Sequence, residues 1–402
     1  MTSTHLSDKA AAYLYKLCLE IPGRRVGTDG NRAATELFAG LMSSFGFETQ
    51  CPAFACIDWT QAGAELTVEG DAFQVQVSPY SLGCKVRGPL AVVSTVADLE
   101  QADLRDRVLL LRGEIAQEQL MPKNFTFYNP DEHKRIVRAM EAAHPVAVAA
   151  ATSRNPELAG GVYPFPLIED GDFDIPSVFM TDEEGNRLAE KAGQMVSLES
   201  RAQRFPSRGC NVVARKGAGA GRRVVLSAHI DAKEGTPGAL DNATGVTTLL
   251  LLAELLAGYA GSLPIEIVAI NGEDYYAASG EVQWVQANAD RFEEILLGIN
   301  LDGIGYREGG TAYSLYECPP ELDALIRQTF AAYPDLVEGE QWYQSDHSLF
   351  VQNGRPALAF TSAEFGPLWA EISHTPRDRP ELVDPAKLVA LAHALHDLLL
   401  RL

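Results

Sequence analysis

The stretch RVVLSAHIDAKEGTPGALDNATGVTTLLLLAELLAG, residues 223–258, decides the fold. It begins with a short apolar run, VVLSA, passes through a polar loop that contains Gly and Pro, and ends in a long apolar run. A continuous apolar strand bounded by turn residues is typical of a parallel sheet that is covered on both faces. We therefore predict a strand at 224–228 and a helix at 244–258, joined as one βα unit.

The same alternation of strand and helix continues to the end of the chain. The expected strands are IEIVAIN, ILLGINLD and PALAFTS, at 265–271, 295–302 and 356–362. The expected helices are SGEVQWVQANA and ELDALIRQTFAAY, at 279–289 and 321–333, with a last helix from Pro385. This alternation predicts an α/β fold with a mixed, mostly parallel sheet flanked by helices.

The N-terminal half of the chain has a different pattern. Apolar residues from Ala34 to Phe45 recur at helical spacing, and Gly46 follows as a stop signal. Residues 59–205 form short β-rich runs separated by Gly, Pro and Asp, among them FQVQV. Because the N-terminal helices bring no strands of this kind, we expect them to pack on the later sheet. The predicted domains are one discontinuous α/β domain, 1–58 and 206–402, and a β-rich insert domain, 59–205.

The composition excludes several classes of protein. With 402 residues and 46% apolar side chains, the chain can fill the cores of two domains. Its net charge of −21 would repel nucleic acid and anionic membranes, so neither is expected as a partner. No secretion signal and no apolar run long enough to span a bilayer are evident, which favours a cytoplasmic location. The six scattered cysteines lack CxxC spacing, which argues against a disulfide framework or a cysteine zinc site.

Polar side chains follow three of the predicted strands at the points where the strands end. His229 follows VVLSA, Glu273 and Asp274 follow IEIVAIN, and Asp302 ends ILLGINLD. In an open parallel sheet, ligands bind beyond the carboxyl ends of the strands. We therefore expect these side chains to converge on one crevice although they lie far apart in the sequence.

Two loops add further metal-binding side chains, Asp241 in GALDNATG and His374 in SHTPRD. Together with His229, Asp274 and Asp302 they form a set of five carboxylate and imidazole donors. Such a set, with one bridging carboxylate, can hold two divalent ions roughly 3.5–4 Å apart. The sequence therefore predicts two divalent metal ions as cofactors, with zinc as the expected metal.

Two acidic residues remain beside these donors. Asp231 lies two residues after His229 and can accept the other ring N–H of that histidine, which would fix its tautomer. Glu273 is left without a metal, and a carboxylate beside a metal-bound water meets the requirement for a general base.

Each of these residues also has an ordinary structural interpretation. His229 alone would more often be a hydrogen-bonded structural histidine, and Asp231 could cap a turn. Asp241 could be the N-cap of the helix that follows it, and Glu273 with Asp274 could be solvated acids at a helix start. The functional interpretation gains weight because all of them occur together, in order, at strand ends.

Several segments resemble the two-zinc aminopeptidases of metallopeptidase clan MH, which also contains glutamate carboxypeptidase and the catalytically inactive transferrin receptor. The matching segments are SAHIDAKEGTPGALDNATG, NGEDYYAASGE, NLDGIG, SDHSLF and SHTPRD, with IPGRRVGTDGNRAA near the start. The resemblance covers residues 1–55 and 206–402, and its motif set is specific. It implies a zinc-exopeptidase-like fold for these residues.

The resemblance also implies a role for each site residue. It makes Asp241 the bridging ligand, with His229 and Asp302 completing one zinc site, and Asp274 and His374 the other. Glu273 becomes the base and Asp231 the residue that orients His229. The family also tends to have a cis peptide after the bridging aspartate, here Asp241–Asn242. One departure is visible, since many members have a second glutamate where this chain has Asp274, which puts metal affinity or metal choice in question.

Residues of the middle region resemble the protease-associated insert found in many such peptidases. The segments are DLRDRVLLLRGE, a helix around HKRIVRAMEAA, VAVAAAT and FDIPSVFMTDEEGNRLAEKAG. The insert could be a lid or wall that limits access to the crevice, or a module for packing or dimer formation. Both interpretations stay open at this stage.

The segment QWYQSDHSLF contains further candidates. His347 can donate a hydrogen bond to a developing oxyanion, or it can be a hydrogen-bonded histidine behind the site. Four aromatic residues, Trp342, Tyr343, Phe365 and Trp369, can wall an apolar pocket or belong to the core. Arg377 can meet a substrate carboxylate, although a salt bridge to Asp378 or Glu381 is the safer expectation.

We therefore predict a zinc-dependent metallopeptidase, a hydrolase that removes N-terminal residues from peptides through a metal-bound hydroxide. The expected partner is a peptide or small amide substrate, and a homo-oligomer is possible. The alternatives are a carboxypeptidase, another amidohydrolase, or an acyl-transfer enzyme like glutaminyl cyclase, which binds one zinc. A non-catalytic binding protein ranks last because all five metal ligands are present.

Overall fold

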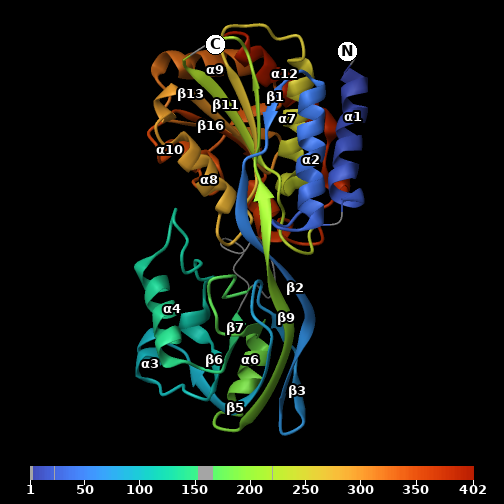
Figure 1. Cartoon of the computed structure of the whole chain (residues 1–402). Helices are drawn as coiled ribbons and strands as arrows, with labels where there is room; N and C mark the ends of the chain where they lie inside the picture. Colours follow the sequence, from blue (N-terminus) through green and yellow to red (C-terminus); the bar gives the residue numbers. More distant parts are fainter. Residues whose placement is uncertain (1–2, 22, 153–165, 220) are drawn as a thin grey trace. The chain divides into compact units, whose positions relative to one another are not determined.

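The computed structural model describes residues 3–21, 23–152, 166–219 and 221–402. Pro22 of the N-terminal motif and residues 153–165 of the predicted insert lie outside these ranges. The chain forms two compact units, Met1–Cys56 with Ser207–Leu402, and Ile57–Pro206 (Figure 1). The unit boundaries lie in two long strands, β2 (Ala53–Val68) and β9 (Met195–Cys210). The boundaries predicted from the sequence, 58/59 and 205/206, fall in the same two strands.

The first unit is built on a sheet of eight strands in the order β1-β10-β12-β11-β13-β16-β14-β15. The strands are β1 (Glu48–Gln50), β10 (Val212–Lys216), β11 (Arg223–His229), β12 (Ile265–Ile270), β13 (Ile295–Leu301), β14 (Thr311–Tyr316), β15 (Leu336–Glu338) and β16 (Ala357–Ser362). The central strands β12, β11, β13 and β16 run parallel, and β1 and β10 run antiparallel to their neighbours, whereas β14 runs antiparallel to β16 and parallel to β15. This confirms the predicted α/β fold with a mixed, mostly parallel sheet.

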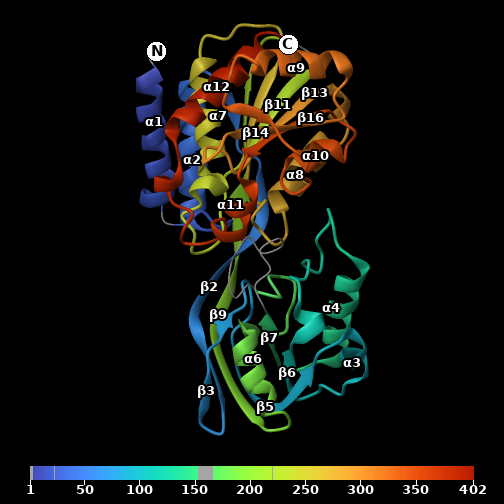
Figure 2. The same ribbon diagram turned by 180° about the vertical axis from the view of Figure 1, so that it is seen from behind.

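Helices lie on both faces of this sheet (Figures 1 and 2). They are α1 (Ser3–Tyr15), α2 (Asp29–Ser44), α7 (Thr244–Leu255), α8 (Ser279–Asn288), α9 (Pro320–Phe330), α10 (His347–Val351), α11 (Phe365–Glu371) and α12 (Pro385–Leu399). Residues of α1, α2, α7, α9 and α12 share one apolar core with one face of the sheet. The N-terminal helices therefore pack on the later sheet, as predicted.

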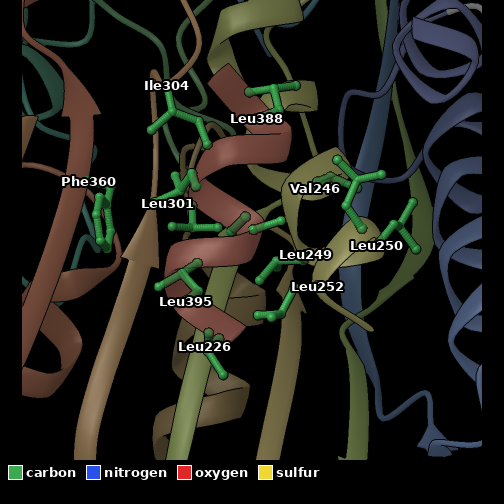
Figure 3. Packing of buried hydrophobic residues seen from close by; sticks show 14 of the residues in the cluster. Leu226, Val246, Leu249, Leu250, Leu252, Leu301, Ile304, Phe360, Leu388 and Leu395 are labelled. Atoms are coloured by element: carbon green, nitrogen blue, oxygen red, sulfur yellow. The ribbon is translucent and has the colours of Figure 1, made fainter. Parts of the chain in front are cut away.

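Helix α7 is the centre of this core. Its leucines from Leu249 to Leu252 are at most 1% exposed, because the helix lies between β11 and the outer helices α1, α2 and α12. Figure 3 shows Leu249, Leu250 and Leu252 in the same apolar cluster as Leu388 and Leu395 of α12 and Leu226 of β11. Burial on every side explains why the sequence of α7 is apolar throughout rather than along one stripe.

Helices α8 and α10 pack on the other face of the sheet. The ring of Trp284 on α8 meets that of Phe350 on α10 at a centroid distance of 5.5 Å. Gly298 of β13 lies directly under Phe350, since a Cβ atom at this glycine would come within 2.3 Å of the ring. Any larger residue at this position would push α10 away from the sheet.

The second unit has its own eight-stranded sheet, in the order β3-β2-β9-β5-β6-β7-β8-β4. Besides β2 and β9, its elements are β3 (Asp71–Phe73), β4 (Gln76–Val77), β5 (Cys84–Val93), α3 (Val96–Gln101), β6 (Val108–Leu111), α4 (Asp131–Ala143), β7 (Ala147–Thr152), β8 (Ser177–Thr181) and α6 (Asp182–Ala189). Helices α3 and α4 share one apolar core of this sheet, and α6 shares the other.

Two sequence expectations differ from the structure. The run FQVQV, 73–77, was expected to be one β segment, but β3 and β4 pair with opposite edges of the second sheet. Because the chain from Phe73 to Gln76 can span only about 11 Å, the two edges of this sheet must lie close together here. Strand β14 was not predicted, because this antiparallel strand includes Ser and Tyr and lacks the continuous aliphatic pattern of its parallel neighbours. No helix in the described part of the chain is long and apolar enough to cross a membrane.

Candidate metal centre

The parallel strands bring the predicted site residues to one edge of the first sheet. His229 is the last residue of β11, and Asp302 comes directly after β13. Glu273 and Asp274 follow the end of β12, which pairs with β11 in parallel register. The carboxyl ends of neighbouring parallel strands meet at the same edge, so these side chains lie together as the strand-end argument predicts.

The carboxylate of Asp241 lies between two imidazole rings. Its Oδ1 atom is 3.1 Å from Nε2 of His229, and its Oδ2 atom is 3.2 Å from Nε2 of His374. The peptide bond between Asp241 and Asn242 is cis, and neither residue has helical backbone angles. Each oxygen of this one carboxylate therefore faces a different histidine.

Each histidine also faces a second carboxylate. Nε2 of His229 is 3.5 Å from Oδ1 of Asp302, and Nε2 of His374 is 3.1 Å from Oδ1 of Asp274. The donor atoms of His229, Asp241 and Asp274 all lie within 4.8 Å of one another, and all three residues are buried. The five predicted ligands thus lie close together. Asp241 lies between two pairs, His229 with Asp302 and His374 with Asp274.

The charges at this site favour a cation between the side chains. Burial alone lowers the pKa of His229, but Asp302 and Asp241 outweigh it and raise the pKa well above 6.5. Burial likewise opposes the charge of His374, yet Asp274 and Asp241 raise its pKa well above 6.5. In Asp241 the two imidazoles outweigh burial and hold the pKa below its usual range. The same carboxylate charges would stabilise a divalent ion bound between these side chains.

The donor set fits a metal ion in chemistry as well as in charge. Imidazole nitrogen and carboxylate oxygen are ligands that zinc and related divalent ions accept. Oδ2 of Asp274 is buried and has no hydrogen-bond partner in the described part of the chain. An unpaired carboxylate oxygen is costly in a protein interior unless a cation or donor satisfies it. These residues can therefore hold a divalent metal.

Asp231 has a different set of contacts from the one expected. Its Oδ1 atom is 3.8 Å from Nδ1 of His229, which is too long for a hydrogen bond. Its carboxylate instead accepts hydrogen bonds from the backbone N–H groups of Gly272 at 2.8 Å and Asp274 at 3.1 Å. Asp231 thereby holds the loop that carries Glu273, and its role in orienting His229 stays a prediction.

Glu273 lies beside the metal ligands at the wall of a pocket with an empty volume of about 360 Å³. The lining residues are Asp241, Glu273, Asp302, Gly303, Trp342, Gln344, Ser345, Thr361, Phe365, Leu368, Trp369, Ser373 and His374. Burial, followed by the neighbouring carboxylates, raises the pKa of Glu273 well above 4.5. A carboxylate with a raised pKa is a better proton acceptor near neutral pH.

One wall of the pocket is aromatic. The rings of Phe365 and Trp369 are stacked at a centroid distance of 5.8 Å, and Trp342 lies 5.4 Å from Phe365. Tyr343, the fourth aromatic candidate, is 63% exposed and is not among the lining residues. The pocket can therefore accept an apolar side chain.

His347 is buried behind this wall. Its Nε2 atom is 2.7 Å from the carbonyl oxygen of Trp342, so Nε2 must carry the hydrogen. The ring lies against Tyr316 and Trp342, and His347 is not among the residues that line the pocket. These contacts match a hydrogen-bonded histidine behind the site, and donation to an oxyanion stays a prediction.

The structure adds Glu281, an acidic residue that was not singled out from the sequence, near Asp346 of the segment QWYQSDHSLF. Glu281 on α8 and Asp346 are both buried, and burial, followed by the charge of Asp346, raises the pKa of Glu281 well above 4.5. Burial raises the pKa of Asp346 to about 7. Glu281 is the last residue of the segment NGEDYYAASGE, and this position in a site motif is the feature of the sequence that could have identified it.

The predicted partner of Arg377 is wrong. Its guanidinium pairs with Glu371 at 3.4 Å, and not with Asp378. Asp378 is fully buried and accepts hydrogen bonds from the backbone of Leu240 and Asp241. A carboxylate that is used by buried backbone groups is unavailable to an exposed arginine.

Comparison with known proteins identifies relatives of this chain. Residues 211–399 match the model of the family described as Peptidase family M28. A curated relative named probable lipoprotein aminopeptidase LpqL, from Mycobacterium tuberculosis, is 25% identical over 88% of this chain and 74% of its own length. Another, named probable leucine aminopeptidase 2, from Aspergillus fumigatus, is 26% identical over 76% of this chain. The chain spans 62% of the length of this second relative.

Solved structures share the fold. An aminopeptidase from Aneurinibacillus sp. strain AM-1 matches with a TM-score of 0.76 and 19% identity, over 100% of this chain and 96% of its own. A zinc aminopeptidase from Bacillus subtilis matches with a TM-score of 0.74 and 19% identity, over 98% and 94% of the two chains. At this identity the likeness shows a shared fold and nothing further.

Proposed function

We propose that this chain, whose residues 211–399 match the model of peptidase family M28, is an aminopeptidase that uses two zinc ions to remove N-terminal residues from peptides. The observation that carries the proposal is the Asp241 carboxylate, which faces His229 with one oxygen and His374 with the other. A carboxylate in this position is suited to bridge two metal ions.

The donors divide naturally between two ions. His229 and Asp302 would hold one ion, and His374 and Asp274 the other, with Asp241 shared. Aspartate supplies the same carboxylate chemistry as glutamate at position 274, and its Oδ1 atom already reaches His374. The relatives named as aminopeptidases support the proposed activity.

The residues around the ions have separable tasks in hydrolysis. The ions, when bound, would polarise the scissile carbonyl and make a water molecule more acidic. Glu273 lies in the same pocket wall as Asp241 and Asp302, so its carboxylate is placed to accept the proton of that water. The same carboxyl group can then pass the proton to the leaving amine.

The pocket is suited to a substrate with a free N-terminus. Its described lining residues include no Lys or Arg side chain, and Glu273 is the lining carboxylate that the proposal leaves without a metal. Carboxylates attract an ammonium group, whereas a carboxypeptidase needs a cationic side chain, usually Arg, for the substrate carboxylate. The pocket chemistry therefore favours an aminopeptidase over a carboxypeptidase.

The proposed activity is tested with paired substrates and a metal count. We expect the zinc-loaded protein to hydrolyse leucyl p-nitroanilide and to leave its N-acetylated form intact, because the acetyl group removes the positive charge. Release of p-nitroaniline is measured by absorbance, and bound zinc by elemental analysis. Equal hydrolysis of the blocked substrate would exclude a strict aminopeptidase. A content near one zinc per chain would favour an enzyme of the glutaminyl cyclase type.

The aromatic wall predicts a preference for large apolar N-terminal side chains. We expect Trp369→Ala to lower kcat/KM for leucyl p-nitroanilide by at least ~10-fold, because an apolar contact of this size contributes a few kcal/mol to discrimination. The value for alanyl p-nitroanilide should change much less. The matched control is Tyr343→Ala, since Tyr343 is an exposed aromatic residue outside the pocket. An equal loss for both substrates in Trp369→Ala would show that the wall does not select the side chain.

Two further assignments belong to this proposal. Residues 57–206 would be an inserted domain of the protease-associated type, acting as a lid or wall or as a module for packing or dimer formation. A cytoplasmic location also stays a proposal, because one relative is by name a lipoprotein.

A further inference from the structure

Two buried ionic side chains contact the segment Pro237–Asp241, which we name the Asp241 loop. One is Arg24, from the N-terminal motif, and the other is Asp378, from SHTPRD. Arg24 is 3% exposed and Asp378 is 0% exposed. Neither has a part in the proton transfers described above, and burying a charge is costly unless its partners repay the cost.

Arg24 donates hydrogen bonds to carbonyl groups of the Asp241 loop and of the residue that follows His229. Its guanidinium donates to the carbonyl oxygens of Pro237 at 2.9 Å and Gly238 at 2.7 Å. It also donates to the carbonyl oxygen of Ile230, the residue that follows His229, at 3.1 Å. One rigid planar group therefore ties the Asp241 loop to the end of the strand that carries His229.

Asp378 binds N–H groups of the same loop. Its Oδ1 atom accepts from the backbone N–H of Leu240 at 2.7 Å, and its Oδ2 atom accepts from that of Asp241 at 3.0 Å. Asp378 lies four residues after His374, in the same segment of chain. The carboxylate thus ties the backbone of Asp241 to the segment that carries the second histidine.

The two contacts complement each other in charge and direction. The guanidinium of Arg24 donates hydrogen bonds to carbonyl groups of this short loop, and the carboxylate of Asp378 accepts hydrogen bonds from its N–H groups. The opposite charges of the two side chains also attract each other. Charge-assisted hydrogen bonds are stronger than neutral ones, and both groups are shielded from water. The backbone of Asp241 is therefore held from both sides.

We propose that Arg24 and Asp378 are positioning residues that hold Asp241 between His229 and His374 and thereby set the affinity of the site for zinc. The proposal rests on the proposed two-zinc function. A purely structural role would lower the stability of the fold without a specific effect on metal binding. The contacts of Arg24 and Asp378 described above reach the backbone of the Asp241 loop and not the side chain of a ligand.

The test compares zinc affinity in full-length variants. In Asp378→Asn one carboxylate oxygen becomes an NH₂ group, which cannot accept a backbone N–H, so one contact to the loop is lost. Mutation of residues that support metal ligands typically costs 10–100-fold in affinity, and we expect a loss of about this size. The control is Asp384→Asn, because Asp384 also accepts a backbone N–H, that of Ala386 at 2.9 Å, at the start of α12.

Zinc affinity is measured by titrating the chelator-stripped proteins against a chromophoric competitor, and the unfolding midpoint of each stripped protein is measured in urea. Asp378→Asn should bind zinc weakly while its kcat recovers at high free zinc with an unchanged KM. Affinity within threefold of the wild type would overturn the proposal. If Asp378→Asn does not fold, Arg24→Lys decides the matter, since Lys keeps the charge but cannot span the same carbonyl groups. A wild-type protein that binds no zinc would instead refute the proposed function.

Discussion

Glu273→Gln is expected to lower kcat for leucyl p-nitroanilide by about 10²–10⁴-fold, the usual contribution of a general base. Glutamine has nearly the same shape but cannot accept the proton of the attacking water. Because Glu273 lines the pocket beside Asp241 and Asp302 and is not one of the five predicted ligands, zinc content should stay at the wild-type value. Steady-state kinetics and elemental analysis on the same preparation measure both quantities.

The matched control for this variant is Glu371→Gln. Glu371 is an exposed residue at the end of α11, the helix that carries Phe365 and Trp369, and it pairs with Arg377. Its loss should change kcat by less than twofold. Activity of Glu273→Gln near that of the wild type would remove Glu273 from the mechanism. Loss of zinc together with activity would make it a ligand instead.

Asp241→Ala is expected to abolish measurable turnover because it removes the one carboxylate that faces both histidines. Without it, His229 keeps Asp302 and His374 keeps Asp274, which leaves two protein donors at each position. Zinc sites in enzymes usually have at least three protein ligands. We therefore expect both ions to bind weakly in this variant.

The comparison variant is Asp302→Ala, which removes a carboxylate near His229 only. It should lose one ion and keep the other, because Asp241, Asp274 and His374 remain together. Zinc content after dialysis against zinc-free buffer distinguishes the two variants. Equal zinc content in Asp241→Ala and Asp302→Ala would show that Asp241 is not shared between two positions.

Part of this site could be predicted from the polar residues that follow the apolar strands. His229, Glu273, Asp274 and Asp302 follow apolar strands, and parallel pairing necessarily brings strand ends together. Asp241 and His374 lie in loops, whose paths do not follow from hydrophobic pattern. They were chosen for their metal-binding atoms, the resemblance to a known family gave them their roles, and their distances to the other residues became known only from the structure.

The supporting residues could not be predicted in the same way. Arg24, Asp378 and Glu281 are buried, although charged side chains are normally expected at the surface. Their partners are backbone groups or a carboxyl group distant in sequence, and no local pattern records such contacts. For the same reason Arg377 was assigned to the nearest acids in sequence, whereas the fold places Glu371 beside it.

The most direct test of the two-metal claim is a crystal structure of the zinc-loaded wild-type protein with anomalous data collected at the zinc absorption edge. We expect two anomalous peaks, one on each side of the Asp241 carboxylate. One peak should lie beside His229 and Asp302, and the other beside His374 and Asp274. A single peak, or peaks that do not contact Asp241, would contradict the two-metal claim.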